Sequence, residues 1–329
     1  MNVLFELSGE HATLPAAEAQ TVLQAHNILF KARQPGRYLT VETDTSLALL
    51  RQIARCLALT HAVHQVHASG TVDDITAALP GLSFSGETFA LRGHRANDSA
   101  SVSHLKRVIG EAICHATGMT VDLDAPDVEL HILVDDRVYL CTSIAGVDRS
   151  SYEQRKPHHR PFSHPISLHP RIARALVNLS GITLGETLLD PFCGTGGILI
   201  EAGLLGAHVV GVDVKARTIK GCRANLEHYG ITDYTLHTAD ATTLALDEVD
   251  ALVTDLPYGR STVTGTDRDG LYRRAFERFA DWLPPGRRAI VGVPEKRLAA
   301  PGEHFFDLVE VHPLYVHRSL TRYFCVFER

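Results

Sequence analysis

The sequence predicts an α/β protein whose C-terminal half is a doubly wound, seven-stranded sheet, preceded by an α+β region. Three observations support this fold class. From Arg171 onward, short apolar runs alternate with helix-like stretches, and glycines 194, 196 and 197 follow the first of those runs. The chain then ends in two long alternating runs, which favour an antiparallel hairpin.

The part of the chain before residue 148 also alternates between strand-like and helix-like runs, without a glycine-rich turn. VLFEL, RYLTVET and AVHQVHAS are strand-like, and the helix-like stretches 16–25 and SLALLRQIARCLAL lie between them. Strand-like TFALRGHRAN and helix-like HLKRVIGEAICHATGM come next, followed by two paired strands that turn at Asp135 and Asp136. Several prolines then interrupt regular structure up to Pro170.

An amphipathic helix marked by Ile172, Leu176 and Leu179 opens the C-terminal half. Ligands of a doubly wound sheet bind beyond the carboxyl ends of its strands. Asp190 and Asp255 end two of the apolar runs and are therefore candidate site residues. The strand-like runs, in chain order, are LLD, VVGVD, YTLHTAD, ALVTD, RAIVGVP, FDLVEVHPLYVH and TRYFCVFE.

The segment DPFCGTGG, residues 190–197, lies between a predicted strand and a predicted apolar helix. Its glycines let the backbone turn sharply and approach a ligand, and the amides at the helix start can face a polar group. The spacing is not G-x-G-x-x-G, so a dinucleotide site is poorly supported. Asp213 ends the next strand, where a carboxylate can accept both hydroxyls of a ribose. A helix cap and turn without a nucleoside is the alternative.

A second motif, Asp255-Leu256-Pro257-Tyr258, follows a later strand-like run. By itself, a carboxylate, a proline and an aromatic ring in succession also fit an ordinary turn. Its position downstream of the glycine turn favours a functional role. Asp240 follows a strand-like stretch between the two motifs, where it either contacts a ligand or caps the next turn.

Both motifs carry a resemblance to methyltransferases. DPFCGTGG resembles motif I of enzymes that use S-adenosylmethionine (AdoMet), and Asp255 to Tyr258 resembles their [ND]-P-P-[YF] signature for methylating a nucleobase amine. Leu256 stands where the family usually has its first proline. The resemblance implies a Rossmann-like domain with AdoMet as cofactor, Asp213 on the ribose and Asp240 on adenine. The implied cofactor residues are His169, Asp190, Pro191, Phe192, Gly194, Thr195, Gly196, Gly197, Asp213, Asp240 and Ala241.

The front half is similar to a THUMP domain, an RNA-binding module of tRNA-modifying proteins. FALRGHR, the helix with Ile109 and Gly110, and VDLDAPD carry that similarity. With the tail VHRSLTRYFCVFE, essentially the whole chain resembles the archaeal tRNA guanosine-10 N2-methyltransferases. The family order implies a ferredoxin-like domain over 1–69, THUMP over 70–147, a basic linker over 148–169 and a methyltransferase domain over 170–329.

Family resemblance implies that the chain methylates the exocyclic N2 amine of a guanosine in tRNA. Such an amine is a poor nucleophile, because its lone pair is delocalised into the ring. Asp255 and a backbone carbonyl of Leu256 or Pro257 can accept its N–H groups and stabilise positive charge on nitrogen. Tyr258 would stack on the extruded base. The sequence leaves open whether one or two methyl groups are added. It also leaves open the oligomeric state and the need for a small activator subunit, as in eukaryotic relatives.

The net charge of −6 makes local basic clusters decisive for binding a nucleic acid. We expect no metal site, because the linker histidines lack paired carboxylates. Six scattered cysteines without a C-x-x-C pair and the lack of a run near 20 apolar residues favour a cytoplasmic protein outside membranes. The candidate RNA-binding residues are Arg92, Arg95, Lys106 and Arg107 in the THUMP-like segment, and Arg155, Lys156 and Arg160 in the linker.

Two other functions stay open. The first is methylation of another tRNA or rRNA guanosine, or of adenine N6 in DNA, although the THUMP-like front half disfavours DNA. The second is a non-catalytic RNA-binding scaffold with a degenerate methyltransferase fold. The presence of Asp190, Asp213, Asp255 and Tyr258 argues against that scaffold.

Overall fold

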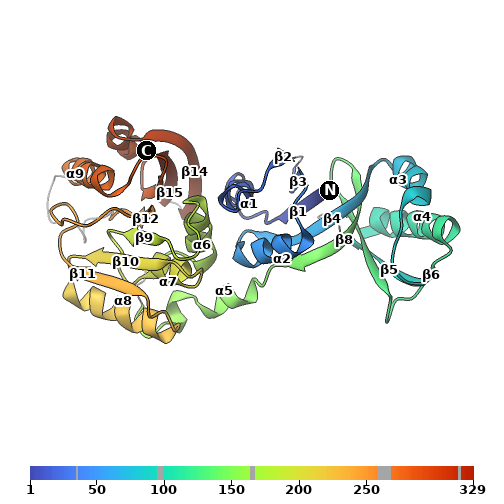
Figure 1. Ribbon diagram of the computed structural model, residues 1–329, viewed down its shortest axis with the longest axis horizontal. Helices are drawn as coiled ribbons and strands as arrows, with labels where there is room; N and C mark the ends of the chain where they lie inside the picture. Colours follow the sequence, from blue (N-terminus) through green and yellow to red (C-terminus); the bar gives the residue numbers. More distant parts are fainter. Residues whose placement is uncertain (35, 95–98, 164–166, 258–267, 318–319) are drawn as a thin grey trace. The chain divides into compact units, whose positions relative to one another are not determined.

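The structure is a computed structural model that describes residues 1–329 except 35, 95–98, 164–166, 258–267 and 318–319 (Figure 1). The chain forms two compact units that are interleaved in sequence. The N-terminal unit comprises Met1–Glu10, Ile28–Arg55 and Thr60–Val147, and the C-terminal unit comprises His11–Asn27, Cys56–Leu59 and Asp148–Arg329. Pieces of the expected ferredoxin-like segment therefore belong to both units.

The described part of the N-terminal unit is built on one mixed sheet, in the order β2-β3-β1-β4-β8-β7-β5-β6. Antiparallel pairing of β4 with β8 joins the first part of the chain to the THUMP-like segment in this sheet. The strands are β1 (Asn2–Leu7), β2 (Phe30–Arg33), β3 (Tyr38–Thr43), β4 (Thr60–Gly70), β5 (Thr88–His94), β6 (Thr120–Val121), β7 (Val128–Val134) and β8 (Val138–Gly146).

Helices of the N-terminal unit bury one apolar stripe each. Helix α4 directs Ile109 and Ile113, four residues apart on one face, into a core with Leu91 and Leu130 of the sheet. Thr71 and Asp74 form a capping box at the start of α3. The helical elements are α2 (Leu47–Cys56), α3 (Val72–Ala78), η1 (Leu79–Gly81) and α4 (Ser99–Thr117).

Seven described strands form the sheet of the C-terminal unit, in the order β11-β10-β9-β12-β13-β15-β14. The first five are parallel, and β15 runs antiparallel to both β13 and β14. The predicted doubly wound sheet with a closing hairpin is thus confirmed. The strands are β9 (Thr187–Asp190), β10 (His208–Asp213), β11 (Tyr234–Thr238), β12 (Ala251–Asp255), β13 (Arg288–Val293), β14 (Asp307–His317) and β15 (Leu320–Glu328).

Helices cover both faces of this sheet, so its strands are apolar on both sides. Leu188 joins the core that contains Leu199, whereas the next residue, Leu189, joins the core that contains Phe276, as alternation along a strand requires. The helical elements are α1 (Leu14–Ala25), α5 (Ser150–Gln154), η2 (Pro157–His159), α6 (Pro170–Leu179), α7 (Gly197–Gly203), α8 (Ala216–His228), α9 (Arg268–Trp282) and η3 (Lys296–His304).

Helix α1 is part of the C-terminal unit although it lies near the start of the chain. Its Glu18 is fully buried and accepts hydrogen bonds from the Ala58 amide at 2.9 Å, the Leu59 amide at 2.8 Å and Asn178 Nδ2 at 2.7 Å. Burial raises the pKa of Glu18 to about 7. Glu18 therefore fastens α1 and 56–59 to α6. Within the described residues, no helix has the length and apolar character to cross a membrane.

Candidate functional site

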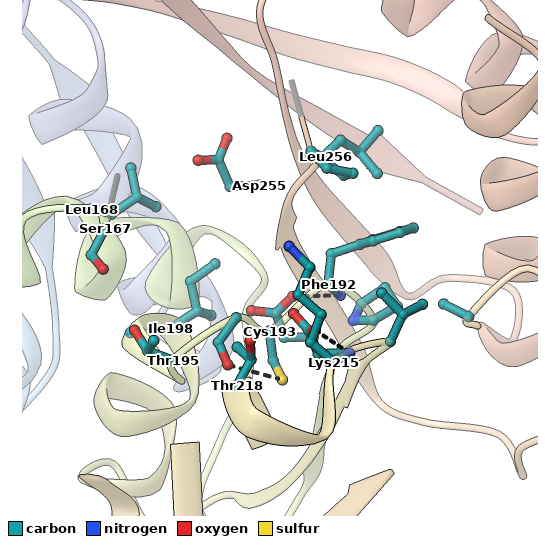
Figure 2. Close-up of a pocket in the computed structure, with 18 of the residues that line it drawn as sticks. Ser167, Leu168, Phe192, Cys193, Thr195, Ile198, Lys215, Thr218, Asp255 and Leu256 are labelled. Carbon is teal, nitrogen blue, oxygen red and sulfur yellow. Dashed lines mark hydrogen bonds between the residues drawn. The ribbon is translucent and has the colours of Figure 1, made fainter. Parts of the chain in front are cut away.

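A cavity of about 720 Å³ opens at the carboxyl ends of the central strands of the C-terminal sheet (Figure 2). Its walls include residues 190–195 after β9, 213–215 after β10, 239–241 after β11 and 255–257 after β12. This is the edge at which the strand pattern predicted a ligand. Figure 2 shows Asp255 and Leu256 at one end of the cavity, with Thr218 and Lys215 at the other.

Most of the residues expected to bind the cofactor line this cavity. Gly196 and His169 are not among the lining residues, and Tyr258 of the second motif lies outside the described residues. The expected residues that do line the cavity are Asp190, Pro191, Phe192, Gly194, Thr195, Gly197, Asp213, Asp240, Ala241, Asp255, Leu256 and Pro257.

The glycine turn after β9 adopts backbone angles that favour glycine. Gly194 has a φ of 52° and Gly196 a φ of 82°, both in the left-handed region. A Cβ on Gly196 would lie 2.6 Å from Cys222 Sγ, so a side chain there would also collide with α8. Gly196 thus shapes the turn behind the cavity without lining it.

Asp190 supports the cavity wall from inside the protein. Its Oδ1 accepts hydrogen bonds from Thr254 Oγ1 at 2.7 Å and from the Phe192 amide at 3.1 Å. Burial raises the pKa of Asp190 to about 7, and the bonds from Thr254 and Phe192 oppose that rise. Asp190 therefore ties the turn after β9 to β12.

Two further carboxylates line the outer part of the cavity. Asp213 is half-buried, and its Oδ1 accepts the Lys215 amide at 2.8 Å. Asp240 is exposed, and its Oδ1 accepts both the amide and the hydroxyl of Thr242 at 2.8 Å. Asp240 therefore caps its own turn while it lines the cavity, so the two interpretations of this residue are compatible.

The segment before α6 closes one side of the cavity, but not through the residue expected from the sequence. His169 is the N-cap of α6: its Nδ1 accepts the Arg171 amide at 3.2 Å, and its Nε2 lies 3.3 Å from Glu153 Oε1. Ser167 and Leu168, directly before it, line the cavity instead. The expected contact of His169 with the cofactor stays a prediction, and the capping bond and the contact with Glu153 argue against it because they engage both ring nitrogens.

Asn225 of α8 fastens this segment to the glycine turn. Fully buried, it accepts the Phe162 amide at 2.9 Å and donates to the carbonyls of Phe162 at 2.8 Å and Thr195 at 2.9 Å. Phe162 packs on Gly221, where a Cβ would lie 2.3 Å from its ring. The sequence offered one sign of this role: Asn225 is a polar residue on the apolar face of a predicted helix. Lining residues that the sequence did not indicate are Phe162, Ser163, Ser167, Leu168, Cys193, Ile198, Val214, Lys215, Arg217, Thr218, Ala239 and Leu271.

Asp255 is the last residue of β12 and faces an arginine from the closing hairpin. Its side chain is 16% exposed, and its Oδ2 lies 3.4 Å from Nη2 of Arg322, whose side chain is 6% exposed. Burial raises the pKa of Asp255 to about 6, and the Arg322 charge acts in the opposite direction. The Arg322 charge therefore favours the ionised form of Asp255 against the effect of burial.

Leu256 replaces the usual proline of the motif without loosening its strand end. Its side chain is fully buried beside Leu252 and Tyr272, and its amide donates to the Gly292 carbonyl at 3.0 Å. A proline has no amide hydrogen for that bond. The Pro257 carbonyl accepts the Tyr272 hydroxyl at 3.1 Å. Burial and these two bonds therefore fix the direction of residues 255–257.

The basic residues of the THUMP-like segment lie on the N-terminal unit. Arg92 Nε is 3.3 Å from Glu129, and its Nη2 donates to the Leu123 carbonyl at 3.1 Å. Lys106 is half-buried near Gly93, and Arg107 is 62% exposed with Glu111 at 3.3 Å. Arg95 lies outside the described residues.

The linker arginines expected to bind RNA point into the C-terminal unit. Glu201 of α7 is fully buried, and its carboxylate receives Arg155 at 2.8 Å and Arg174 at 3.1 Å. Arg160 is 5% exposed and donates to the Arg155 carbonyl at 2.9 Å. Lys156 forms an ion pair with Glu153. A buried carboxylate needs paired charge, so Arg155 stabilises the core of this unit. The expected contacts of Arg155, Lys156 and Arg160 with RNA stay a prediction, and the burial of Arg155 and Arg160 argues against it.

Comparisons with known proteins agree with this architecture. Residues 157–323 match the family described as "RMKL-like, methyltransferase domain", and residues 72–143 match the THUMP domain. The chain is 38% identical to the tRNA (guanine(10)-N2)-dimethyltransferase of Methanothermobacter thermautotrophicus over 100% of both chains. It is 34% identical to the enzyme of the same name from Pyrococcus abyssi over 98% of both.

A solved structure shows the same fold at lower identity. The crystal structure of TrmN from Thermus thermophilus is 20% identical, superposes with a TM-score of 0.53 and is covered in full, as is this chain. The fold and cavity define a methyltransferase with a THUMP domain. The chain belongs to the tRNA (guanine(10)-N2)-dimethyltransferase family.

Proposed function

We infer that this protein is an AdoMet-dependent methyltransferase that acts on the exocyclic N2 amine of a guanosine in tRNA. The observation that carries this inference is Asp255, which lies at one end of a nucleoside-sized cavity with Lys215 at the other end (Figure 2), and Asp213 lines the same cavity. The chain is 38% and 34% identical, over 100% and 98% of its length, to two enzymes named for guanine 10 of tRNA, which supports nucleotide 10 as the target. The cytoplasm is the proposed location of this activity.

The cavity fits AdoMet in size and in the polar groups of its wall. Its volume is about 720 Å³, within the range typical of cofactor sites. In this proposal Asp213 accepts the ribose hydroxyls, Asp240 accepts a hydrogen bond from the adenine amino group, and the turn at Gly194 admits the ligand close to the backbone. Ser167 and Leu168 would also contact the bound cofactor. AdoMet supplies a methyl group activated by its sulfonium.

Asp255 and the neighbouring backbone would activate the guanine amine. An ionised carboxylate only accepts hydrogen bonds, so it can take an N–H of the amine and draw the lone pair out of conjugation. The Pro257 carbonyl already accepts Tyr272 and has a second lone pair for the amine. Both acceptors would stabilise the positive charge that develops on nitrogen during transfer. Tyr258 remains the proposed stacking residue.

The N-terminal unit is the proposed tRNA-binding part of the chain. A THUMP domain over 72–143 supports this role, and Arg107 offers the most exposed of the described candidate charges. We propose Arg92, Arg95, Lys106 and Arg107 as phosphate contacts. These residues would attract phosphate through a local positive potential, because the chain as a whole carries a net charge of −6 and repels a nucleic acid.

The test is methylation of an unmodified tRNA transcript by the purified chain with AdoMet, followed by nucleoside mass spectrometry. We expect N2-methylguanosine, and its conversion to N2,N2-dimethylguanosine would show a second transfer. A transcript with adenosine at nucleotide 10 is the control and should stay unmethylated. Methylation of that control, or methyl groups on another base, would contradict the assignment. Turnover that appears only after a cell extract is added would indicate an activator subunit.

A further inference from the structure

Arg322 reaches the catalytic motif from a distant part of the chain. It lies on β15, two residues before Phe324, which pairs with Gly292 of β13, and Gly292 in turn pairs with Asp255. Gly292 leaves room at this crossing, since a Cβ there would lie 2.5 Å from Asp255 Oδ1. The hairpin register thus brings the Arg322 guanidinium to 3.4 Å from Asp255 Oδ2.

Among the described residues, the other charged groups near Asp255 include several carboxylates. Asp190, on the adjacent strand β9, interacts with Asp255 by charge repulsion. Asp213 and Asp240 line the same cavity, and so do Lys215 and Arg217. Lys215 and Asp255 are at separate ends of the cavity in Figure 2. Arg322 is therefore the cation in direct contact with the Asp255 carboxylate in the described part of the chain.

We propose that Arg322 is a positioning residue for the methyl transfer, holding Asp255 in the orientation and ionised state that accept the guanine amine. This inference rests on the function proposed above. A protonated Asp255 would present an O–H donor toward the N–H groups of the amine and lose an acceptor site. Arg322, buried behind the carboxylate, acts through Asp255 and touches neither substrate nor cofactor in this scheme.

The effect of Arg322 can be measured on the pKa of Asp255, because burial raises this pKa and the Arg322 charge lowers it. Burial raises the pKa of Asp255 to about 6, and Arg322 keeps it from rising further. A carboxylate beside an arginine has its pKa lowered by roughly 1–3 units. Removing the guanidinium charge therefore moves the pKa of Asp255 into the neutral range, where the acceptor is lost.

The first test compares Arg322→Gln and Arg322→Lys with the wild type in single-turnover methyl transfer to a tRNA transcript across pH. In the wild type, the rate should fall as pH drops through about 6. In Arg322→Gln, this acid limb should move to higher pH by about 1–3 units, with AdoMet affinity by calorimetry unchanged. Arg322→Lys retains the positive charge, so its acid limb should lie close to that of the wild type.

Arg288→Gln is the matched control. Arg288 lies on β13, and its Nε is 3.2 Å from Glu328, so the substitution removes an arginine–carboxylate pair of the same sheet remote from Asp255. Its acid limb should match the wild type. An acid limb that is unmoved in Arg322→Gln, or moved equally in Arg288→Gln, would overturn the inference.

A second readout does not need activity. Titration of the Asp255 carboxyl by NMR in protein labelled at aspartate Cγ, assigned with Asp255→Asn, measures its pKa directly. A higher midpoint in Arg322→Gln supports the inference even if guanosine in tRNA is not methylated, in which case only the proposed function fails. An unchanged midpoint in an active, folded variant overturns the role of Arg322 and leaves the proposed function intact.

Discussion

Asp190 and Asp255 end two neighbouring strands of one sheet, β9 and β12, yet their surroundings differ. Asp190 is 1% exposed, and its Oδ1 is taken by Thr254 and the Phe192 amide. Asp255 faces the cavity, with Arg322 behind it. Burial raises the pKa of both, to about 7 and about 6. The same residue type thus serves to build the wall in one case and to carry charge at its surface in the other.

Position at the end of a strand is therefore not enough to assign a role to an acidic residue. Both aspartates follow apolar runs and precede a proline within two residues. Their partners separate them: internal donors satisfy Asp190, whereas a cation from the hairpin keeps Asp255 ionised. We therefore expect substitutions at the two positions to change different properties.

Asp255→Ala should have the largest effect. Loss of an oriented acceptor aimed at the transition state typically lowers kcat by ~10²–10³, while AdoMet affinity stays close to that of the wild type because the carboxylate faces the amine. Single-turnover kinetics with a tRNA transcript and calorimetry with AdoMet measure the two quantities. Transfer at nearly the wild-type rate would remove Asp255 from the mechanism.

Asp213→Ala should produce the opposite pattern. Removing charge-assisted bonds to the ribose should weaken AdoMet binding by ~1–3 kcal/mol. Affinity for tRNA should barely change, because Asp213 lies in the cofactor part of the cavity. Calorimetry that finds the same AdoMet affinity in variant and wild type would reject this assignment.

Asp190→Asn should keep the fold and most turnover. Both hydrogen bonds end on Oδ1, and an amide oxygen can accept them equally. The folded pKa of about 7 exceeds the ordinary value of 3.8, so the stability that protonated Asp190 contributes is lost as pH rises through this range. The free energy of unfolding of the variant should therefore gain on that of the wild type between those pH values. Denaturant titrations at several pH values measure this quantity. If the free energies of unfolding of variant and wild type change in parallel with pH, the pKa of Asp190 is not raised by burial.

Substitution of Lys106 and Arg107 by alanine should have the smallest effect, confined to tRNA. For each ion pair with a phosphate that the substitution removes, the slope of log K against log salt should flatten by up to ~0.7–0.9, with AdoMet affinity intact. The matched control is Arg155→Ala, whose side chain pairs with buried Glu201 and should change stability rather than the salt slope. A change in salt slope for Arg155→Ala alone would reverse the assignment of these charges.

The fold and the cofactor part of the cavity follow from local patterns. Apolar alternation predicts the strands, glycines 194 and 196 permit the left-handed backbone of the turn, and Asp213 ends a strand. These features depend on neighbours in the chain, and the rule on strand ends then places them at one edge.

Contacts between distant residues were not accessible in the same way. Arg322 meets Asp255 only through the register of β13 with β15, and Glu18 meets α6 only because α1 folds with the C-terminal unit. The burial of the linker arginines Arg155 and Arg160 could not be predicted either, because packing sets the exposure of a side chain. Glu201 within the apolar run GILIEAG was the available sign that buried charge needed partners.

In the proposed reaction, the Asp255 end of the cavity, and not the Asp190 carboxyl, receives the amine. A crystal structure of the chain with S-adenosylhomocysteine and tRNA tests this most directly. The account predicts guanine N2 at hydrogen-bond distance from an Asp255 oxygen, about 2.7–3.2 Å, with Arg322 still against the same carboxylate. A guanine N2 placed away from Asp255, against Asp190 or outside the cavity, would contradict it.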